Sequence, residues 1–162
     1  MDAPHVRFHI RAARAEEAAV LTALILRSKA HWDYAPALLE AWRADLTLTA
    51  AMIASAPTYC AEEAATGTVA GVSHFYPLND AEVYLDHLFV EPAAIGQGVG
   101  ALLWRHAIAW ATDQGARAVV LGADPHARPF YEHMGATVVD WIDSSVVPGR
   151  RNPRMRYDLP PG

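Results

Sequence analysis

The stretch that decides the fold is Leu85-Asp86-His87-Leu88-Phe89-Val90-Glu91-Pro92-Ala93-Ala94-Ile95-Gly96-Gln97-Gly98-Val99-Gly100-Ala101-Leu102-Leu103. An apolar segment is followed by a proline, by alternating glycines and by a second apolar segment, which is typical of a strand, a loop and a helix. Glycines let backbone N–H groups crowd against an anion, and a helix N-terminus adds the positive end of its dipole. The stretch therefore predicts a phosphate site made of backbone amides.

The bulk composition bounds the rest. A chain of 162 residues, 52% hydrophobic and 19% charged, fits one globular domain spanning residues 1–162. Its net charge of −5 argues against a partner such as nucleic acid or an anionic membrane. Cys60 is the single cysteine, and residues 1–5 carry no signal-peptide pattern, so we expect a cytoplasmic protein without an intrachain disulfide. No apolar run is long enough to span a bilayer.

Hydrophobic periodicity predicts the order of the elements. Strands are expected at residues 6–11, 58–61, 68–76, 82–90, 118–122, 136–141 and 154–159. Helices are expected from residue 15, at 36–43, after Thr49, at 98–114 and at 127–133. The early strands form a meander, whereas the strand, helix and strand around the glycine loop require a parallel pair. The prediction is an α/β fold with a mixed, mostly antiparallel sheet flanked by helices.

The glycine loop alone fits more than one phosphate ligand. The segment from Gly96 to Ala101 matches the dinucleotide pattern G-x-G-x-x-G/A, and Asp124 follows at the distance expected of a ribose-binding acid. Dinucleotide-binding folds begin with this motif, however, and the 38 residues after Asp124 are too few for a second nucleotide-binding half. A P-loop needs a lysine after its glycines, and none follows here.

Two motifs together favour another ligand. They are Ile95-Gly96-Gln97-Gly98-Val99-Gly100 and Asp124-Pro125-His126-Ala127-Arg128-Pro129-Phe130-Tyr131-Glu132-His133-Met134-Gly135-Ala136. In order and spacing they resemble the Q/R-x-x-G-x-G/A and N-x-x-A-x-x-F-Y-x-x-x-G-F/A elements of the GNAT superfamily of acetyl-CoA-dependent N-acetyltransferases. Ile95 replaces the usual Gln or Arg. Asp124 replaces the usual Asn, and a carboxylate accepts hydrogen bonds but does not donate them.

The resemblance implies acetyl-CoA as co-substrate and a parallel strand pair that splays at the cofactor site. The backbone from Leu88 to Val90 would pair with the pantetheine arm, and the amides from Gln97 to Ala101 would hold the pyrophosphate. The implied cofactor-binding residues are Leu88, Phe89, Val90, Ile95, Gly96, Gln97, Gly98, Val99, Gly100, Ala101, Asp124, Ala127 and Phe130.

Acetyl transfer to an amine also needs acid–base groups. An alkyl amine has a pKa of about 10.4 and arrives mostly charged, so a base or a water chain must remove a proton. Asp86 and Tyr84 match positions where relatives place such groups, although Asp86 could instead bind a cationic substrate or an arginine. Strand alternation turns His87 to the opposite side, which favours a structural histidine. Tyr131 matches the family tyrosine that protonates the leaving thiolate; the alternative is a tyrosine that only packs on the cofactor.

By the same resemblance, residues 28–34 and 144–150 shape the acceptor site. His31, Trp32 and Tyr34 would form an aromatic wall, and Arg150 would pair with a carboxylate of the acceptor, although these aromatics fit helix packing equally well. Cys60 has no adjacent histidine and is expected in the core rather than as an acetyl-enzyme nucleophile. No histidine or carboxylate spacing predicts a metal site.

The leading hypothesis is an acetyltransferase that moves the acetyl group of acetyl-CoA to a primary amine of a small molecule or amino acid. Transfer would occur by direct attack in a ternary complex. A non-catalytic acyl-CoA-binding module and a dinucleotide-dependent enzyme are the alternatives. Members of the family often dimerise through their sheet edges, so the resemblance also allows a homodimer, which the sequence does not decide.

Overall fold

The computed structural model describes residues 6–161, within which seven strands form one sheet in the order β1-β2-β3-β4-β5-β7-β6. The strands are β1 (Phe8–Ala12), β2 (Thr58–Glu63), β3 (Val69–Pro77), β4 (Glu82–Val90), β5 (Ala118–Gly122), β6 (Thr137–Asp143) and β7 (Arg151–Asp158). The helices are α1 (Ala18–Ala30), α2 (Pro36–Leu46), α3 (Ala50–Ser55), α4 (Val99–Asp113) and α5 (Arg128–His133), with 3-10 turns η1 (Ala15–Glu17) and η2 (Pro92–Ala94). None of these helices is long and apolar enough to cross a membrane.

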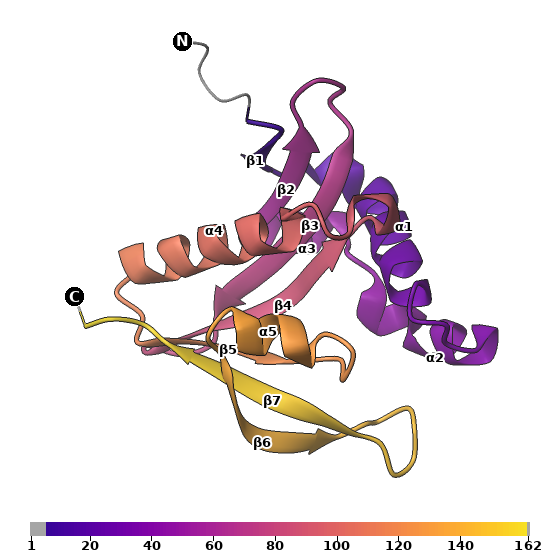
Figure 1. Cartoon of the computed structure of the whole chain (residues 1–162), viewed down its shortest axis with the longest axis vertical. Helices are drawn as coiled ribbons and strands as arrows, with labels where there is room; N and C mark the ends of the chain where they lie inside the picture. The colour runs from indigo at the N-terminus through magenta and orange to yellow at the C-terminus, as the bar shows by residue number, and fades with distance from the viewer. Residues whose placement is uncertain (1–5, 162) are drawn as a thin grey trace.

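The sheet separates two layers of helices. Figure 1 shows α4 on one side of β2 to β4 and the α1–α2 pair on the other, with the β6–β7 hairpin at the far end of the sheet from β1. Phe75 and Leu85 pack with Trp104 of α4, whereas Val72 packs with Leu24 of α1. Both faces of the sheet are therefore buried along β3 and β4, which explains why these strands are so apolar.

The parallel pair confirms the predicted mixed sheet. β4 pairs with β3 in antiparallel fashion along most of its length, but with β5 only from Glu82 to Tyr84, opposite Ala118 to Val120. Beyond Tyr84 the two parallel strands have no ladder between them. One edge of β4 is thereby left open from Leu85 onward, at the strand that leads into the glycine loop.

A β-bulge in β4 overturns one prediction. The register shifts between His74 and Phe75, so that His74 lies opposite His87 while Phe75 lies opposite Leu85. Asp86 is the extra residue, and a bulge of this kind reverses the alternation of the side chains that follow it. The prediction that His87 faces away from Asp86 is wrong: Nε2 of His87 lies 3.4 Å from Oδ2 of Asp86.

Helix α4 begins and ends within one residue of the prediction, and its buried residues are Val99, Leu103, Trp104, Ala107 and Ala111. Gly71 of β3 allows the close approach, because a Cβ there would lie 2.8 Å from the Val99 side chain. The missing side chain at Gly71 therefore lets Val99 and Leu103 of α4 lie against β3.

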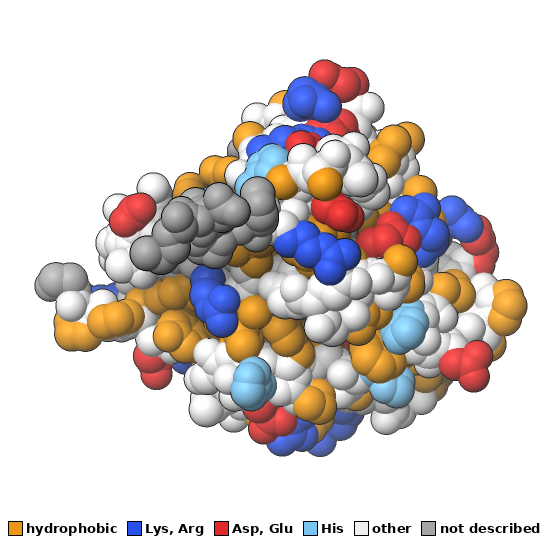
Figure 2. Space-filling view, turned by 45° about the horizontal axis from the view of Figure 1, so that its top comes forward, with side chains coloured by type: hydrophobic (Ala, Val, Ile, Leu, Met, Phe, Trp, Pro, Cys, Tyr) orange, Lys and Arg blue, Asp and Glu red, His pale blue; other side chains and the backbone are white. Residues whose placement is uncertain are grey.

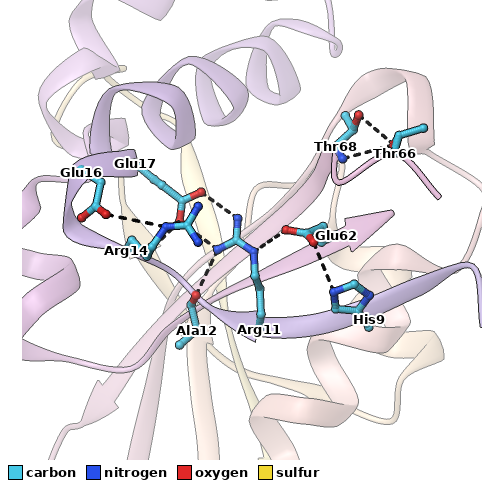
Figure 3. Close-up of polar contacts among 9 residues, drawn as sticks. All are labelled: His9, Arg11, Ala12, Arg14, Glu16, Glu17, Glu62, Thr66 and Thr68. Carbon is cyan, nitrogen blue, oxygen red and sulfur yellow. Dashed lines mark hydrogen bonds and ion pairs between the residues drawn. The ribbon is translucent and has the colours of Figure 1, made fainter. Parts of the chain in front are cut away.

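A charged network fixes the corner where β1 meets η1 (Figure 3). The Arg11 guanidinium donates to Glu62 at 2.5 Å and to both carboxylate oxygens of Glu17 at 2.9 and 2.8 Å. The hydrogen bonds from Arg11 lower the pKa of Glu17 to about 2, against the opposing effect of burial. Glu17 also accepts the backbone N–H of Arg14, so the network closes the first turn of the helical segment.

Candidate active site

A cleft of about 630 Å³ opens where β4 and β5 part. Its walls come from the end of β4, the glycine loop with the start of α4, helix α5, and the end of α1. All predicted cofactor residues line it except Gln97. On the face drawn in Figure 2, hydrophobic side chains run between scattered charged and histidine side chains. The residues that line the cleft are mainly apolar, with a few polar side chains such as Lys29, Arg105 and Asp124, as in most small-molecule sites.

The glycine loop presents free backbone donors to the cleft. Gly96 and Gly98 adopt φ of +84° and +85°, and Gly98 is the N-cap of α4. The first helical hydrogen bond runs from the N–H of Leu102 to the carbonyl of Gly98 at 3.0 Å. The four N–H groups from Gly98 to Ala101 precede it and have no backbone acceptor among residues 6–161. The N–H of Gln97 instead turns back to the carbonyl of Ala94 at 3.3 Å.

Helix α5 packs closely against this loop. A Cβ on Gly100 would lie 3.3 Å from the ring of Phe130, so the glycine lets the two motifs meet. Ile95 lines the cleft with 43% of its surface exposed. Because the side chain of Ile95 is apolar, it donates no hydrogen bond to an anion. The donors that the loop presents to an anion are therefore its backbone N–H groups.

Tyr131 lies at the inner part of the cleft. Its side chain is 6% exposed, and its ring contacts those of Trp104 and Phe130 at centroid distances of 5.6 and 5.1 Å. Burial, with a further contribution from nearby Tyr84, raises the pKa of Tyr131 far above that of a free phenol. The hydroxyl is therefore protonated at neutral pH and has a proton to give.

Asp86 and Tyr84 lie on β4 outside the cleft-lining residues. Oδ2 of Asp86 is 3.4 Å from Nε2 of His87 and 3.9 Å from Nε2 of His74. Burial raises the pKa of Asp86, His74 opposes this effect, and Asp45 of α2 adds to it. Burial also raises the pKa of Tyr84. The two residues predicted to handle the amine proton therefore sit in a surrounding that favours their protonated forms.

Two of the predicted acceptor residues, Tyr34 and Arg150, meet at Asp124. Its Oδ2 accepts from Lys29 Nζ at 2.5 Å, from the Tyr34 hydroxyl at 2.8 Å and from Arg150 Nη2 at 3.3 Å. Burial alone would raise the pKa of Asp124, but the hydrogen bond and the charge of Lys29 hold it below its ordinary value. Two cations therefore share one carboxylate, which leaves an excess positive charge at this end of the cleft.

The predicted aromatic residues His31 and Trp32 form a cluster with His126 at the wall of the cleft. Trp32, after α1, stacks on His126, after β5, with ring planes 2° apart and centroids 5.0 Å apart. The edge of His31 meets Trp32 at 5.2 Å. Trp32 and His126 both line the cleft.

Three residues of the site were not singled out from the sequence, although Lys29 falls within the segment 28–34 that was expected to shape the acceptor site. Lys29 and Trp42 belong to the cluster around Asp124, because the ammonium of Lys29 lies 4.5 Å from the centre of the Trp42 ring. Arg105 of α4 lines the cleft. Lys29 and Trp42 lie more than 80 positions from Asp124 and carry no local signal. Arg105 did have one, because it lies less than two turns into the helix that follows the glycines.

Two further expectations from the sequence concerned Cys60 and a metal site. Cys60 is fully buried in the core, and burial raises the pKa of its thiol to about 11, so it lacks both the access and the ionisation of a nucleophile. Within the described residues, no group of three or more His, Cys, Asp and Glu side chains is arranged to hold a metal ion.

Comparison with solved structures finds the same fold elsewhere. A GCN5-related N-acetyltransferase from Rhodopseudomonas palustris superposes with a TM-score of 0.77 at 22% identity, over 98% of this chain and 100% of that one. The PaiA N-acetyltransferase of Thermoplasma acidophilum, solved in complex with coenzyme A, gives 0.79 at 15% identity, over 95% and 100%. YncA of Salmonella typhimurium, solved with acetyl-CoA, gives 0.68 at 22% identity, over 97% and 96%.

Comparison with curated proteins gives no match. The model of the acetyltransferase (GNAT) family matches residues 24–136, which include the glycine loop, the splayed strand and the Phe130-Tyr131 motif. This span covers more than half of the chain. The dinucleotide alternative is therefore set aside, and the chain belongs to the GNAT family of acetyltransferases.

Proposed function

We propose that this protein transfers the acetyl group of acetyl-CoA to the primary amine of a small molecule or amino acid. The amine attacks the thioester directly while both substrates are bound. Membership of the family supports acetyl transfer in general. The acceptor and the residue roles that follow are our proposal.

The observation that carries the proposal is that three features occur together in one cleft. The cleft has an open edge of β4, four N–H groups without backbone acceptors at the start of α4, and the buried hydroxyl of Tyr131. An extended, phosphate-bearing ligand needs a strand edge for its arm and an amide cradle for its phosphates. A thioester needs, in addition, an acid near its sulfur. Acetyl-CoA is the common acyl donor that combines these needs.

The residues divide the chemistry as follows. The amides from Gly98 to Ala101 bind the pyrophosphate, with Arg105 of α4 adding positive charge nearby. The backbone of β4 from Leu88 to Val90 pairs with the pantetheine arm, and an N–H there polarises the thioester carbonyl. Tyr131 gives its proton to the thiolate as it leaves. Asp86, which is partly exposed on β4 two residues after Tyr84, takes the proton of the incoming ammonium through water.

Charge supports a small, polar acceptor. The cluster of Lys29, Arg150 and Asp124 carries a net charge of plus one and is only 12 to 16% exposed at its side chains. A partly buried excess cation is stabilised by an anion. An amine that also bears a carboxylate, such as an amino acid, supplies both the nucleophile and that anion. Trp32 and His31 form the apolar part of the same wall.

The test is thiol release from acetyl-CoA in the presence of a panel of amines: amino acids, their decarboxylated analogues, polyamines and peptides. We expect amine-dependent release, faster with amino acids than with the analogues that lack the carboxylate. Tight binding of acetyl-CoA with no release for any amine would instead identify a non-catalytic acyl-CoA-binding module.

A further inference from the structure

A polar group with no role so far lies behind Asp86. His74 of β3 is 2% exposed, and it is brought to Asp86 and His87 by the bulge in β4. Its Nδ1 lies 2.8 Å from Oγ1 of Thr58 on β2, and its Nε2 lies 3.9 Å from Oδ2 of Asp86. The ring therefore connects a fixed hydroxyl on one side with the carboxylate on the other.

The hydrogen bonds of Thr58 link its hydroxyl to the tautomer of His74. The hydroxyl has one hydrogen: when it donates to the carbonyl of Ala56, at 3.1 Å, Oγ1 is the acceptor towards Nδ1 of His74, at 2.8 Å, and this is the arrangement that the proposal uses. Nδ1 of a neutral His74 then carries the proton, and Nε2 presents a bare lone pair to Asp86. For His87 the opposite holds: its Nε2 faces the same carboxylate oxygen at 3.4 Å, while its buried Nδ1 has no partner among the described residues. Nε2 of His87 is thus placed to donate to the Asp86 carboxylate, whereas Nε2 of His74 can accept from Asp86 only once Asp86 has taken up a proton.

We propose that His74 and Asp86 share a proton, and that Nε2 of His74 accepts the proton that Asp86 removes from the acceptor ammonium. This inference rests on the proposed acetyl transfer and deepens it. Asp86 remains the group that meets the substrate through water, and His74 acts through Asp86 as a positioning residue. The 3.9 Å separation is longer than a direct hydrogen bond and fits one that tightens, or is bridged by water, when substrate is bound.

The proton balance is simple. The acceptor ammonium loses one proton to the Asp86 carboxylate and becomes a neutral amine. The proton then resides on Asp86 or on Nε2 of His74, and in the second case the imidazolium donates to Asp86 on one side and to Thr58 on the other. After transfer this proton leaves to solvent along the same path, while the second N–H proton, which the amine loses as the amide forms, restores the hydroxyl that Tyr131 gave up to the thiolate. No bond to carbon is made by either residue.

The surrounding charges suit this role. Burial lowers the pKa of His74, Asp86 raises it and His87 lowers it again, so the ring is neutral at pH 7. Burial lowers the pKa of His87 to about 4, which keeps that ring neutral too. The other titratable groups nearby are Tyr76 and Tyr84, whose pKa values are raised, and Asp45, which acts on Asp86 from α2. A neutral acceptor therefore faces the one carboxylate that meets the amine.

The first test is nuclear magnetic resonance of the free protein with ¹⁵N-labelled histidine. We expect the Nδ1–H tautomer for neutral His74, and a lower His74 pKa in Asp86→Asn, because the carboxylate that stabilises the imidazolium is gone. An Nε2–H tautomer, or a His74 titration unchanged by Asp86→Asn, overturns the proposal. This readout does not depend on turnover.

The second test is the pH profile of kcat/KM for the amine in His74→Asn. The asparagine amide nitrogen can still donate to Thr58, so the variant removes Nε2 alone. We expect a loss of about 10²-fold near neutral pH and a displaced acidic limb, with the KM for acetyl-CoA unchanged. His106→Asn, which alters a half-buried histidine on α4, is the matched control and keeps the wild-type profile. A wild-type profile in His74→Asn, or a uniform loss at every pH, overturns the role.

The two tests separate this inference from the proposed function. If the wild-type protein acetylates no amine yet His74 responds to Asp86→Asn, the acetyl transfer is refuted and the shared proton stands. If the protein is active and His74 does not respond, the reverse holds.

Discussion

At the scale of single residues, Tyr131 and the loop glycines have the most specific roles in the proposed chemistry. Tyr131 is buried against Trp104 and Phe130 and lines the cleft, and burial keeps its hydroxyl protonated. Gly98 holds a left-handed conformation at the start of α4, where its N–H is free. Each residue supports a prediction that separates its chemical role from its structural one.

Tyr131→Phe removes only the hydroxyl and keeps the packing of the ring. We expect turnover to fall by about 10²-fold, because a general acid contributes at least that much, while the affinity for CoA stays nearly unchanged. Steady-state kinetics and calorimetric titration with CoA check this. Tyr59→Phe, on β2 against His106, is the control and keeps wild-type turnover. Equal turnover in Tyr131→Phe and wild type would mean that the thiolate leaves without this acid.

Gly98→Asp puts a carboxylate where the pyrophosphate would bind. We expect CoA binding to be lost in a titration, through charge repulsion as well as strain at φ +85°. Gly98→Asn is isosteric and neutral, tolerates the same conformation, and should retain more affinity. Gly67→Asp imposes similar strain at φ +73° in the β2–β3 turn and should bind CoA as wild type does. CoA binding retained by Gly98→Asp refutes the amide cradle.

At the scale of elements, the helices and strands follow local sequence signals closely, and the bulge does not. β5 at Ala118–Gly122 and the capping of α3 by Thr49 agree with the prediction, because continuous apolar runs and N-cap residues are local signals. The bulge at Asp86 inserts one extra residue into β4, and whether it forms depends on the pairing with β3. The alternation of apolar and polar residues within β4 alone therefore does not predict it. That one residue brings the ring of His87 to the side of Asp86.

The Arg11 network makes the corner of β1, η1 and β2 sensitive to acid. Glu17→Gln should destabilise the fold by about 1 kcal/mol at pH 7, since it removes a charge-assisted pair that is partly exposed. The pKa of Glu17 is lowered to about 2, below the unfolded value near 4.3. The contribution is therefore complete above about pH 4.3 and is lost as the pH falls towards 2. Urea unfolding of both proteins from pH 7 to pH 3 should show their difference shrinking with acid; a constant gap would contradict the assignment.

At the scale of the whole molecule, one carboxylate joins three distant parts of the chain. Asp124 after β5 binds Lys29 of α1 and Arg150 before β7, with Tyr34 between them. Motif comparison predicted that Asp124 and Arg150 belong to the site, but not that they bind each other. Such contacts follow from the way the β6–β7 hairpin and the helical pair close on the sheet, and the sequence carries no pattern for them. The glycine loop and the Phe130-Tyr131 motif were readable because each is contiguous.

The substitution Asp124→Asn tests directly whether this carboxylate holds the three segments together. Lys29 and Arg150 would keep their partly buried positions without a counter-charge, so we expect a loss of about 1–3 kcal/mol in the free energy of unfolding. Because the pKa of Asp124 lies below its ordinary value, the difference from wild type should be full at neutral pH and should diminish as the pH falls below about 4. Asp113→Asn, exposed near the end of α4, is the control. Equal stability of Asp124→Asn and wild type would show that the cluster does not hold these segments together.

The central claim is that an acetyl group passes directly from acetyl-CoA to an amine in this cleft. The measurement that tests it most directly compares free CoA thiol with N-acetylated amine, by mass spectrometry, in one reaction with the best acceptor of the panel. The account predicts equal amounts of both products, formed only when acetyl-CoA and amine are present together, and no acetyl group on the protein. Thiol released without acetylated amine, or an acetyl group found on Cys60, would contradict it.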